Sequence, residues 1–130
     1  MRPETALQRQ LRQYLAHRGF HSVHVPNGAV LGGDSVKRAI QMANLKRDGL
    51  MIGFPDLLVY ASGGRIGHIE VKTTKGRHEP SQIAVQCWLE GLAHHYAVCR
   101  SIDDVAAALE AWGWGCKWGQ IGRASCRERV

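Results

Sequence analysis

Hydrophobic and polar positions along the chain predict alternating helices and strands. The first predicted helix begins at Pro3 and ends before Gly19. Its apolar residues recur at helical spacing, at Leu7, Leu11, Tyr14 and Leu15. A short strand is expected over 20–25, followed by a helix that Asp34 caps and that runs to about Arg47. The glycine-rich run between these two elements predicts an irregular connection.

Two apolar runs on either side of a Ser-Gly-Gly turn at 62–64 predict an antiparallel hairpin, and Asp56 opens its first strand. Side chains alternate along a strand, so His68, Glu70 and Lys72 share one face of the second strand. Glu70 and Lys72 are therefore expected to converge on one small volume.

The second half of the chain predicts a helix, a strand and a further helix. The helix that begins at 79–82 has a wide stripe of apolar residues that we expect to be buried: Ile83, Val85, Trp88, Leu89 and Leu92. Residues 96–99 predict a short buried strand, and Ser101 is expected to cap the last helix, which has acids in its first turn. This order of elements predicts an α/β domain.

Asp56 is followed after thirteen residues by Glu70-Val71-Lys72, which gives two carboxylates and one amine. A metal-dependent phosphodiesterase needs such a set. Together with Pro55, these residues resemble the motif of the PD-(D/E)XK nuclease superfamily. Short motifs also recur by chance. The alternative is a strand that carries His, Glu and Lys on a solvent face.

The surrounding residues resemble the VRR-NUC family, a compact branch of that superfamily, over roughly Glu4 to Trp112. The resemblance rests on five pieces in the same order: Glu4 on the first helix, Gly53-Phe54-Pro55-Asp56, Glu70-Val71-Lys72, the Ser81-Gln82 helix start, and the run through Gly91, Tyr96-Ala97-Val98, Ser101 and Asp104. It implies a restriction-endonuclease-like nuclease domain over 1–119, with a small mixed sheet flanked by helices.

The resemblance implies that Glu4, Asp56 and Glu70 hold a divalent metal ion, with the Val71 carbonyl as a further ligand. Hard carboxylate and carbonyl oxygens suit Mg²⁺ or Mn²⁺, which can neutralise charge on a pentacovalent phosphate and activate water. For Glu4 a second explanation stays open, because an acid in the first turn of a helix interacts favourably with the helix dipole.

Lys72 and Gln82 complete the catalytic set that the resemblance implies. Lys72 would lie beside the scissile phosphate, where it either deprotonates water or stabilises developing charge. We favour orientation of the nucleophile and charge stabilisation, because an ammonium acts as a base near neutral pH only if its pKa is lowered. Gln82, near a helix N-terminus, would help to hold water or phosphate. The alternative for Gln82 is an ordinary polar residue of a first turn.

The chain has 130 residues, 45% of them hydrophobic, which predicts one domain with a single core. Its formal net charge of +6 suits a polyanionic partner such as DNA. We expect DNA phosphate contacts at Lys46, Arg47, Lys75 and Arg77. Each of these residues alone is also typical of a solvated surface charge.

The C-terminal part of the chain has two unusual features. Residues 111–119 hold three tryptophans among glycines, a pattern that fits base stacking, cover for a core edge or a dimer contact. We favour a structural role. Residues 120–130 resemble the translation of a common sequencing adapter, and we expect them to be a non-native tail outside the fold. Without the tail the formal net charge falls to +4, which is still basic.

Cysteine and histidine usage predicts a reduced protein without a zinc site. Outside the tail, Cys87, Cys99 and Cys116 are unevenly spaced, and we expect the first two to be small apolar residues on packed elements. The seven histidines lack companion ligands at zinc-site spacing. No apolar run approaches 18 residues, so no membrane helix is expected. We expect a cytoplasmic protein of a bacterial host cell, of phage or prophage origin.

The resemblance implies a homodimer that acts on branched DNA, with two active sites on two symmetric strands. We therefore expect a metal-dependent, structure-selective DNA endonuclease that resolves four-way (Holliday) junctions. A flap or general structure-selective nuclease is the alternative activity. A non-catalytic DNA-binding module on a nuclease fold is a second class, since fold alone does not establish activity.

Overall fold

The computed structural model describes residues 2–26 and 31–114, which form four helices and four strands. Their order is α1 (Pro3–His17), β1 (His21–His24), α2 (Ser35–Arg47), β2 (Leu57–Ala61), β3 (Arg65–Val71), α3 (Pro80–Gly91), β4 (His95–Cys99) and α4 (Ile102–Ala111). All the predicted helices and strands are present. Residues 115–130, which include Cys116, Trp118 and the expected tail, lie outside the described residues.

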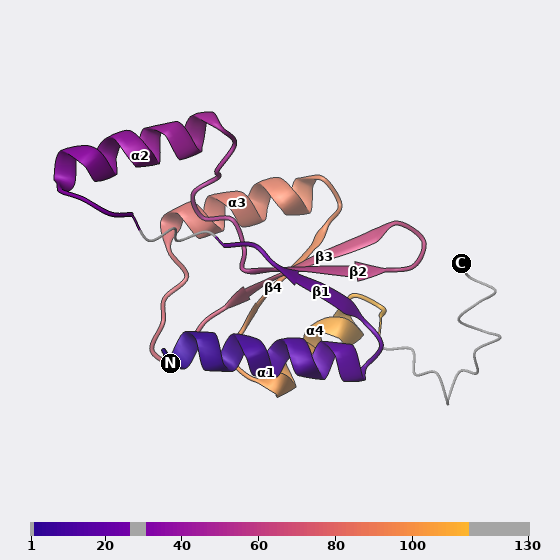
Figure 1. Ribbon diagram of the computed structural model, residues 1–130. Helices are drawn as coiled ribbons and strands as arrows, with labels where there is room; N and C mark the ends of the chain where they lie inside the picture. Colours follow the sequence, from indigo (N-terminus) through magenta and orange to yellow (C-terminus); the bar gives the residue numbers. More distant parts are fainter. Residues whose placement is uncertain (1, 27–30, 115–130) are drawn as a thin grey trace.

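The four strands form one mixed sheet in the order β1-β2-β3-β4 (Figure 1). β2 pairs antiparallel with both β1 and β3, and the β2–β3 pairing is the predicted hairpin. β4 pairs parallel with β3, because α3 carries the chain back across one face of the sheet. The expected small mixed sheet flanked by helices is therefore present.

Helices α1 and α4 cover one face of the sheet, and α3 covers the other (Figure 1). The larger core lies under α1 and α4, where Leu11, Ile69 and Leu109 are fully buried. Two of the three tryptophans of 111–119 close this core at its edge. Trp114 is buried and stacks on Phe20, with the ring centroids 5.8 Å apart.

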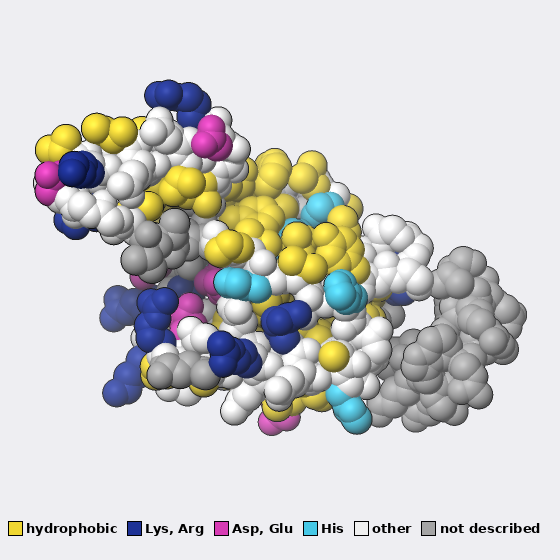
Figure 2. All heavy atoms as spheres, viewed as in Figure 1, with side chains coloured by type: hydrophobic (Ala, Val, Ile, Leu, Met, Phe, Trp, Pro, Cys, Tyr) yellow, Lys and Arg dark blue, Asp and Glu magenta, His cyan; other side chains and the backbone are white. Residues whose placement is uncertain are grey.

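The predicted burial of α3 is wrong in part. Val85 and Leu89 are buried, but Ile83, Trp88 and Leu92 are 46%, 48% and 52% exposed. A helix on a narrow sheet can bury only the residues that point straight at the strands, so the rest of the apolar stripe faces outward. Figure 2 shows hydrophobic side chains gathered over this part of the molecule.

Cys87 and Cys99 have different environments. Cys99 is buried on β4, as expected, and its burial raises the pKa of the thiol to about 12. Cys87 is exposed on α3, so the expectation that it packs as a small apolar residue is wrong. It lies on the outward side of the helix, next to Trp88.

α2 projects from the rest of the described structure (Figure 1). Asp34 caps it as predicted, since its side chain accepts a hydrogen bond from the backbone N–H of Lys37 at 2.8 Å. Yet α2 has no buried residue, and it packs on no other helix or strand of the described residues. Among the described residues, no helix is long and apolar enough to cross a membrane.

Candidate active site

Asp56 lies just before β2, in register with Glu70 on β3. Leu57 pairs with Ile69, so the residue before Leu57 comes opposite the residue after Ile69. Paired residues of a sheet point to the same face, and Asp56 and Glu70 therefore approach each other on the α3 side. The backbone N–H of Val71 donates to Asp56 Oδ2 at 2.8 Å, which fixes the Asp56 carboxylate at the end of the hairpin.

Glu70 is a buried carboxylate with one unpaired oxygen. Its residue exposure is 3%, and its Oε2 accepts a hydrogen bond from Gln82 Nε2 at 3.0 Å. Its Oε1 is buried and has no hydrogen-bond partner. Burial raises the pKa of Glu70 to about 8, and so do the charge of Asp56 and a hydrogen bond that the protonated Glu70 can share with the Asp56 side chain. A buried, unsatisfied carboxylate oxygen needs an explanation, and a bound cation is one that also relieves the repulsion by Asp56.

Lys72 lies beside Glu70, as expected from their shared face of β3. Its Nζ lies 3.6 Å from Glu70 Oε2, and its side chain is only 12% exposed. Its backbone N–H donates to the Cys99 carbonyl at 3.1 Å, which continues the β3–β4 pairing past the end of β3. The alternative of a solvent-facing strand is wrong, because this face of β3 is covered by α3 and both His68 and Glu70 are buried.

Gln82 is held in one orientation by its own helix end. Its Oε1 accepts a hydrogen bond from the backbone N–H of Glu79 at 2.8 Å, within a capping box at the start of α3. The side-chain amide group is thereby left to point its N–H toward Glu70. Gln82 is thus a polar residue of the first helical turn, as the alternative explanation has it. It is also a direct hydrogen-bond partner of the buried Glu70 carboxylate.

Gly53 allows the loop before Asp56 to lie against the start of α3. Its φ is +87°, and a Cβ at this position would come within 2.5 Å of the Ser81 carbonyl oxygen. A side chain would therefore meet both backbone strain and backbone atoms of α3. The glycine brings Pro55-Asp56 and Ser81-Gln82 together on one side of Glu70.

We expect Gly53→Ala to lower the melting temperature by several degrees and to reduce any activity of the site at least tenfold. Gly49→Ala is the matched control, since Gly49 also has a positive φ (+111°) but open space around its Cβ position. The strain of the left-handed backbone is then common to both variants, on the order of 1–2 kcal/mol. Equal melting temperatures and activities of the two variants would show that the contact with α3 is unimportant.

Glu4 lies at the edge of the site. It is exposed in the first turn of α1, and it lines a pocket of about 510 Å³ together with Asp56. Its charge contributes to raising the pKa of Glu70. Within residues 2–26 and 31–114, no three His, Cys, Asp or Glu side chains form a closed metal cluster. Asp56 and Glu70 are thus the central carboxylates, and Glu4 stands further out.

The donors present fit a hard divalent cation. Asp56 and Glu70 supply carboxylate oxygens, and the raised pKa of Glu70 reflects a local excess of negative charge. Val71 follows Glu70 in the chain, and its N–H contacts Asp56, so its backbone lies beside both residues. These three residues, with Glu4 as an outer ligand, would hold the ion.

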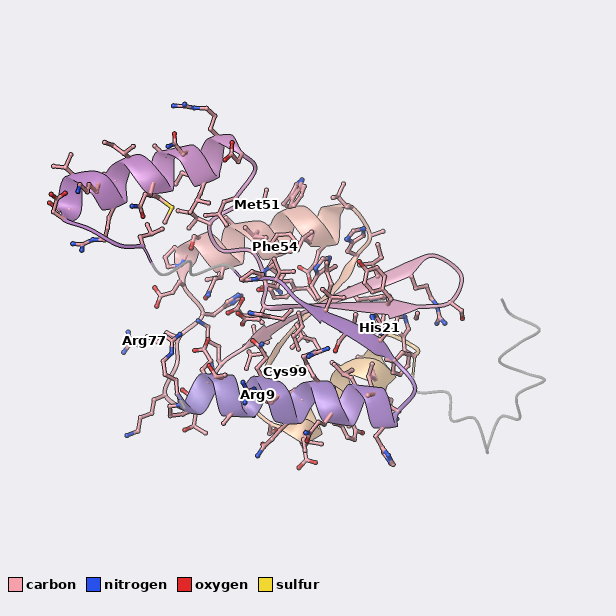
Figure 3. The ribbon with its side chains drawn as sticks, viewed as in Figure 1. Arg9, His21, Met51, Phe54, Arg77 and Cys99 are labelled. Carbon is pink, nitrogen blue, oxygen red and sulfur yellow. The ribbon has the colours of Figure 1, made fainter. Side chains whose placement is uncertain are left out.

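The four expected DNA contacts fall in two places. Lys75 and Arg77 are exposed on the connection from β3 to α3, immediately after Lys72 (Figure 3). Lys46 and Arg47 are exposed in the last turn of α2, which projects from the domain. The first pair is therefore placed beside the candidate site, and the second is carried by a separate element.

Arg100 positions the chain beside the candidate site, and the sequence pattern did not reveal it. Its Nη1 donates to the carbonyls of Thr73 and Gly76 at 2.6 and 2.7 Å, so it holds the turn that follows Lys72. Its backbone N–H donates to Asp104 Oδ2 at 2.8 Å. Carbonyl acceptors leave no side-chain signal in a sequence, so the contact could not be predicted.

Two solved structures share the fold described above. One, called "VRR_NUC domain", is 19% identical with a TM-score of 0.57, and the match covers 84% of this chain and 96% of the other. The second, called "VRR_NUC domain protein", is 19% identical with a TM-score of 0.62, and the match covers 86% and 88%. No protein-family model matches the chain, and no curated protein matches it significantly.

The chain therefore has the restriction-endonuclease-like fold of VRR_NUC domains over most of its length. The expected fold class is confirmed. At this level of identity the likeness establishes the fold, and the activity has to be argued from the residues of the site.

Proposed function

We propose that this protein is a metal-dependent endodeoxyribonuclease that hydrolyses phosphodiester bonds in branched DNA. The observation that carries the proposal is the buried Glu70 carboxylate, with an unpaired oxygen, beside Asp56 and Lys72. The VRR_NUC names of both structural neighbours support a nuclease as the general class. Mg²⁺ or Mn²⁺ is the proposed ion, because the candidate ligands are all oxygens.

When bound, such an ion supplies Lewis-acid stabilisation of the charge that builds up on the phosphate during hydrolysis. The residues of the chain have separate tasks around it. Asp56 and Glu70 would hold the cation, and the Val71 N–H keeps the Asp56 carboxylate in place. Gln82 orients Glu70 through its hydrogen bond to Oε2, and the other oxygen, Oε1, would be available as a ligand.

Lys72 is proposed to act on the substrate. Its ammonium lies on the same face as both carboxylates and can place positive charge on a non-bridging phosphate oxygen. In the same position it can orient the attacking water by a hydrogen bond. Because its neighbour Glu70 is fixed by Gln82, the ammonium is held in place before the substrate arrives.

Four-way junctions are the proposed preferred substrate, and a homodimer is the proposed form. A two-fold symmetric dimer presents two equal sites to two symmetric strands. An exposed apolar surface on the α3 side of the sheet supports self-association, and we call it the α3-side patch. Its residues are Val23, Tyr60, Trp88 and Leu92, which are 39–52% exposed.

Cleavage assays with labelled four-way junction, flap, duplex and single-stranded DNA test the activity, each in Mg²⁺, Mn²⁺ and EDTA. Symmetric nicking of the junction in Mg²⁺ or Mn²⁺, absent in EDTA, is the expected result. Preferred cleavage of the flap would select the alternative nuclease. Slowed migration of DNA without cleavage in any metal would select the binding module.

We expect Trp88→Glu to convert a dimer into a monomer, because a charge in an apolar interface has to be desolvated on association. The molar mass in solution, measured by light scattering during size-exclusion chromatography, should halve. Trp88 is half exposed, so the fold should keep its melting temperature. Ala43→Glu adds the same charge at an exposed position of α2 and is the control. An unchanged dimer in the Trp88 variant would show that the α3-side patch is not the interface.

A further inference from the structure

A basic pocket adjoins the candidate active site on its α1 side. It has a volume of about 510 Å³ and lies between the first turns of α1, the end of β1 and Asp56. Its lining includes three arginines, Arg2, Arg9 and Arg12, together with His24. Glu4 and Asp56 form its acidic side. None of the four basic residues belongs to the DNA contacts expected from the sequence.

The arginines are brought together by helical spacing. Arg9 and Arg12 are three residues apart on α1, so they lie on one side of the helix, and Arg2 precedes the first turn on the same side of the pocket. All three side chains are exposed. Figure 2 shows basic side chains around acidic ones at this edge of the molecule, below the projecting α2.

Two of the basic groups have fixed contacts: Arg12 with β1, and His24 with the backbone just before β2. Arg12 donates from Nε to Ser22 Oγ at 3.2 Å and from Nη2 to the Ser22 carbonyl at 3.1 Å, and Ser22 is buried. His24 Nδ1 lies 3.1 Å from the Asp56 carbonyl oxygen, which accepts only, so Nδ1 carries the proton. The wall of the pocket is therefore partly organised before any ligand binds.

The charge balance of the pocket favours an anion once a cation is bound. Three guanidinium groups face two carboxylates, and both carboxylates belong to the proposed metal ligands. A divalent ion would neutralise them and leave the arginines as the dominant charge. Guanidinium groups bind phosphate oxygens through paired N–H donors. Arg77 comes from a different element, the connection from β3 into α3, whereas Arg9 lies on α1 (Figure 3).

We propose that this pocket binds the phosphodiester backbone of the DNA strand that is cut, at phosphates next to the scissile one. Arg9 and Arg2 contact the phosphates, and Arg12, fixed on Ser22, shapes the wall behind them. This inference rests on the proposed nuclease function. It adds a strand-binding surface on α1 to the one expected from Lys75 and Arg77.

The test is DNA binding under conditions that prevent cleavage. Fluorescence anisotropy of a labelled four-way junction in Ca²⁺ compares wild type with Arg9→Gln and with Arg18→Gln. The second variant removes the same charge from the far end of the same helix. Arg9→Gln should weaken binding about tenfold at moderate salt and reduce the slope of log K against log salt by about one. Arg18→Gln should change affinity less than twofold.

Both variants should stay folded and keep the rise in melting temperature with divalent ions, although Arg18→Gln also loses its contacts with Tyr14. Equal weakening of DNA binding by the two variants would contradict the proposal, because the overall positive charge of the surface would then explain the binding. Loss of the metal response in Arg9→Gln would also overturn it. If inorganic phosphate at low millimolar concentration displaced the junction, the pocket would be a site for a small phosphate ligand and not for a DNA strand. If wild type binds DNA but never cleaves it, the nuclease proposal fails while the Arg9 comparison still decides the pocket.

Discussion

Glu70→Gln and Asp56→Asn are each expected to abolish DNA cleavage and the rise in melting temperature that divalent ions cause. Both substitutions keep the size of the side chain and remove the negative charge that binds a cation. Wild type should gain several degrees in Mg²⁺ or Mn²⁺, because a ligand that binds only the folded state stabilises it by mass action. Differential scanning fluorimetry with and without EDTA measures the shift, and the junction assay measures cleavage.

The metal-free protein provides an independent check on Glu70. Its pKa in the folded state is raised from 4.5 to about 8, so between these values the folded protein holds a proton that the unfolded chain has lost. The stability of wild type in EDTA should therefore fall as the pH rises from 5 to 8. Glu70→Gln cannot ionise and should lose this part of the pH dependence.

Glu90→Gln is a matched control, because Glu90 is exposed on the same α3 that covers Glu70. It should keep the wild-type response to metal and to pH. Full activity or an intact metal shift in Glu70→Gln would contradict the assignment of the site. The same melting curve for wild type at pH 5 and pH 8 in EDTA would contradict the burial of a strained carboxylate.

The sequence predicted the centre of the site because that centre depends on local geometry. Alternation along β3 places Glu70 and Lys72 on one face, and a tight turn at 62–64 fixes the register that brings Asp56 opposite Glu70. The position of Gln82 could also be predicted, since the helix start that carries it has a clear signal at Glu79-Pro80, while its role in the site stays a prediction. Such local patterns depend on neighbouring residues and do not require knowledge of how distant elements pack.

What the sequence did not predict depends on contacts between elements. The solvent-facing alternative for β3 could be excluded only after α3 was seen to cover that face. The outward half of the α3 stripe, with Trp88 at 48% exposure, has the same spacing as a buried stripe. In the sequence, Arg9 and Arg12 have the spacing of the polar side of any amphipathic helix. Only the structure shows that they line a pocket together with Asp56.

Lys72→Ala is expected to lower the cleavage rate about a hundredfold, the usual cost of losing one preorganised donor to a transition state. The amine binds no cation, so the melting temperature should still rise with Mg²⁺ or Mn²⁺. Removing it also takes away the one positive charge that lowers the pKa of Glu70. The stability of the metal-free variant should therefore begin to recover at a higher pH than in wild type as the solution is acidified.

Lys75→Ala separates catalysis from binding, because Lys75 is exposed on the turn three residues further along and is proposed to contact only DNA phosphates. It should weaken junction affinity at low salt while single-turnover cleavage of bound DNA keeps its rate. Lys72→Ala should do the reverse, with a slow single turnover and near-normal affinity in Ca²⁺. If Lys72→Ala cut bound junction at the wild-type rate, the Lys72 ammonium would interact with Glu70 and have no role at the phosphate. Charge stabilisation at the phosphate would then have to come from a bound ion and from the arginines of the basic pocket beside α1.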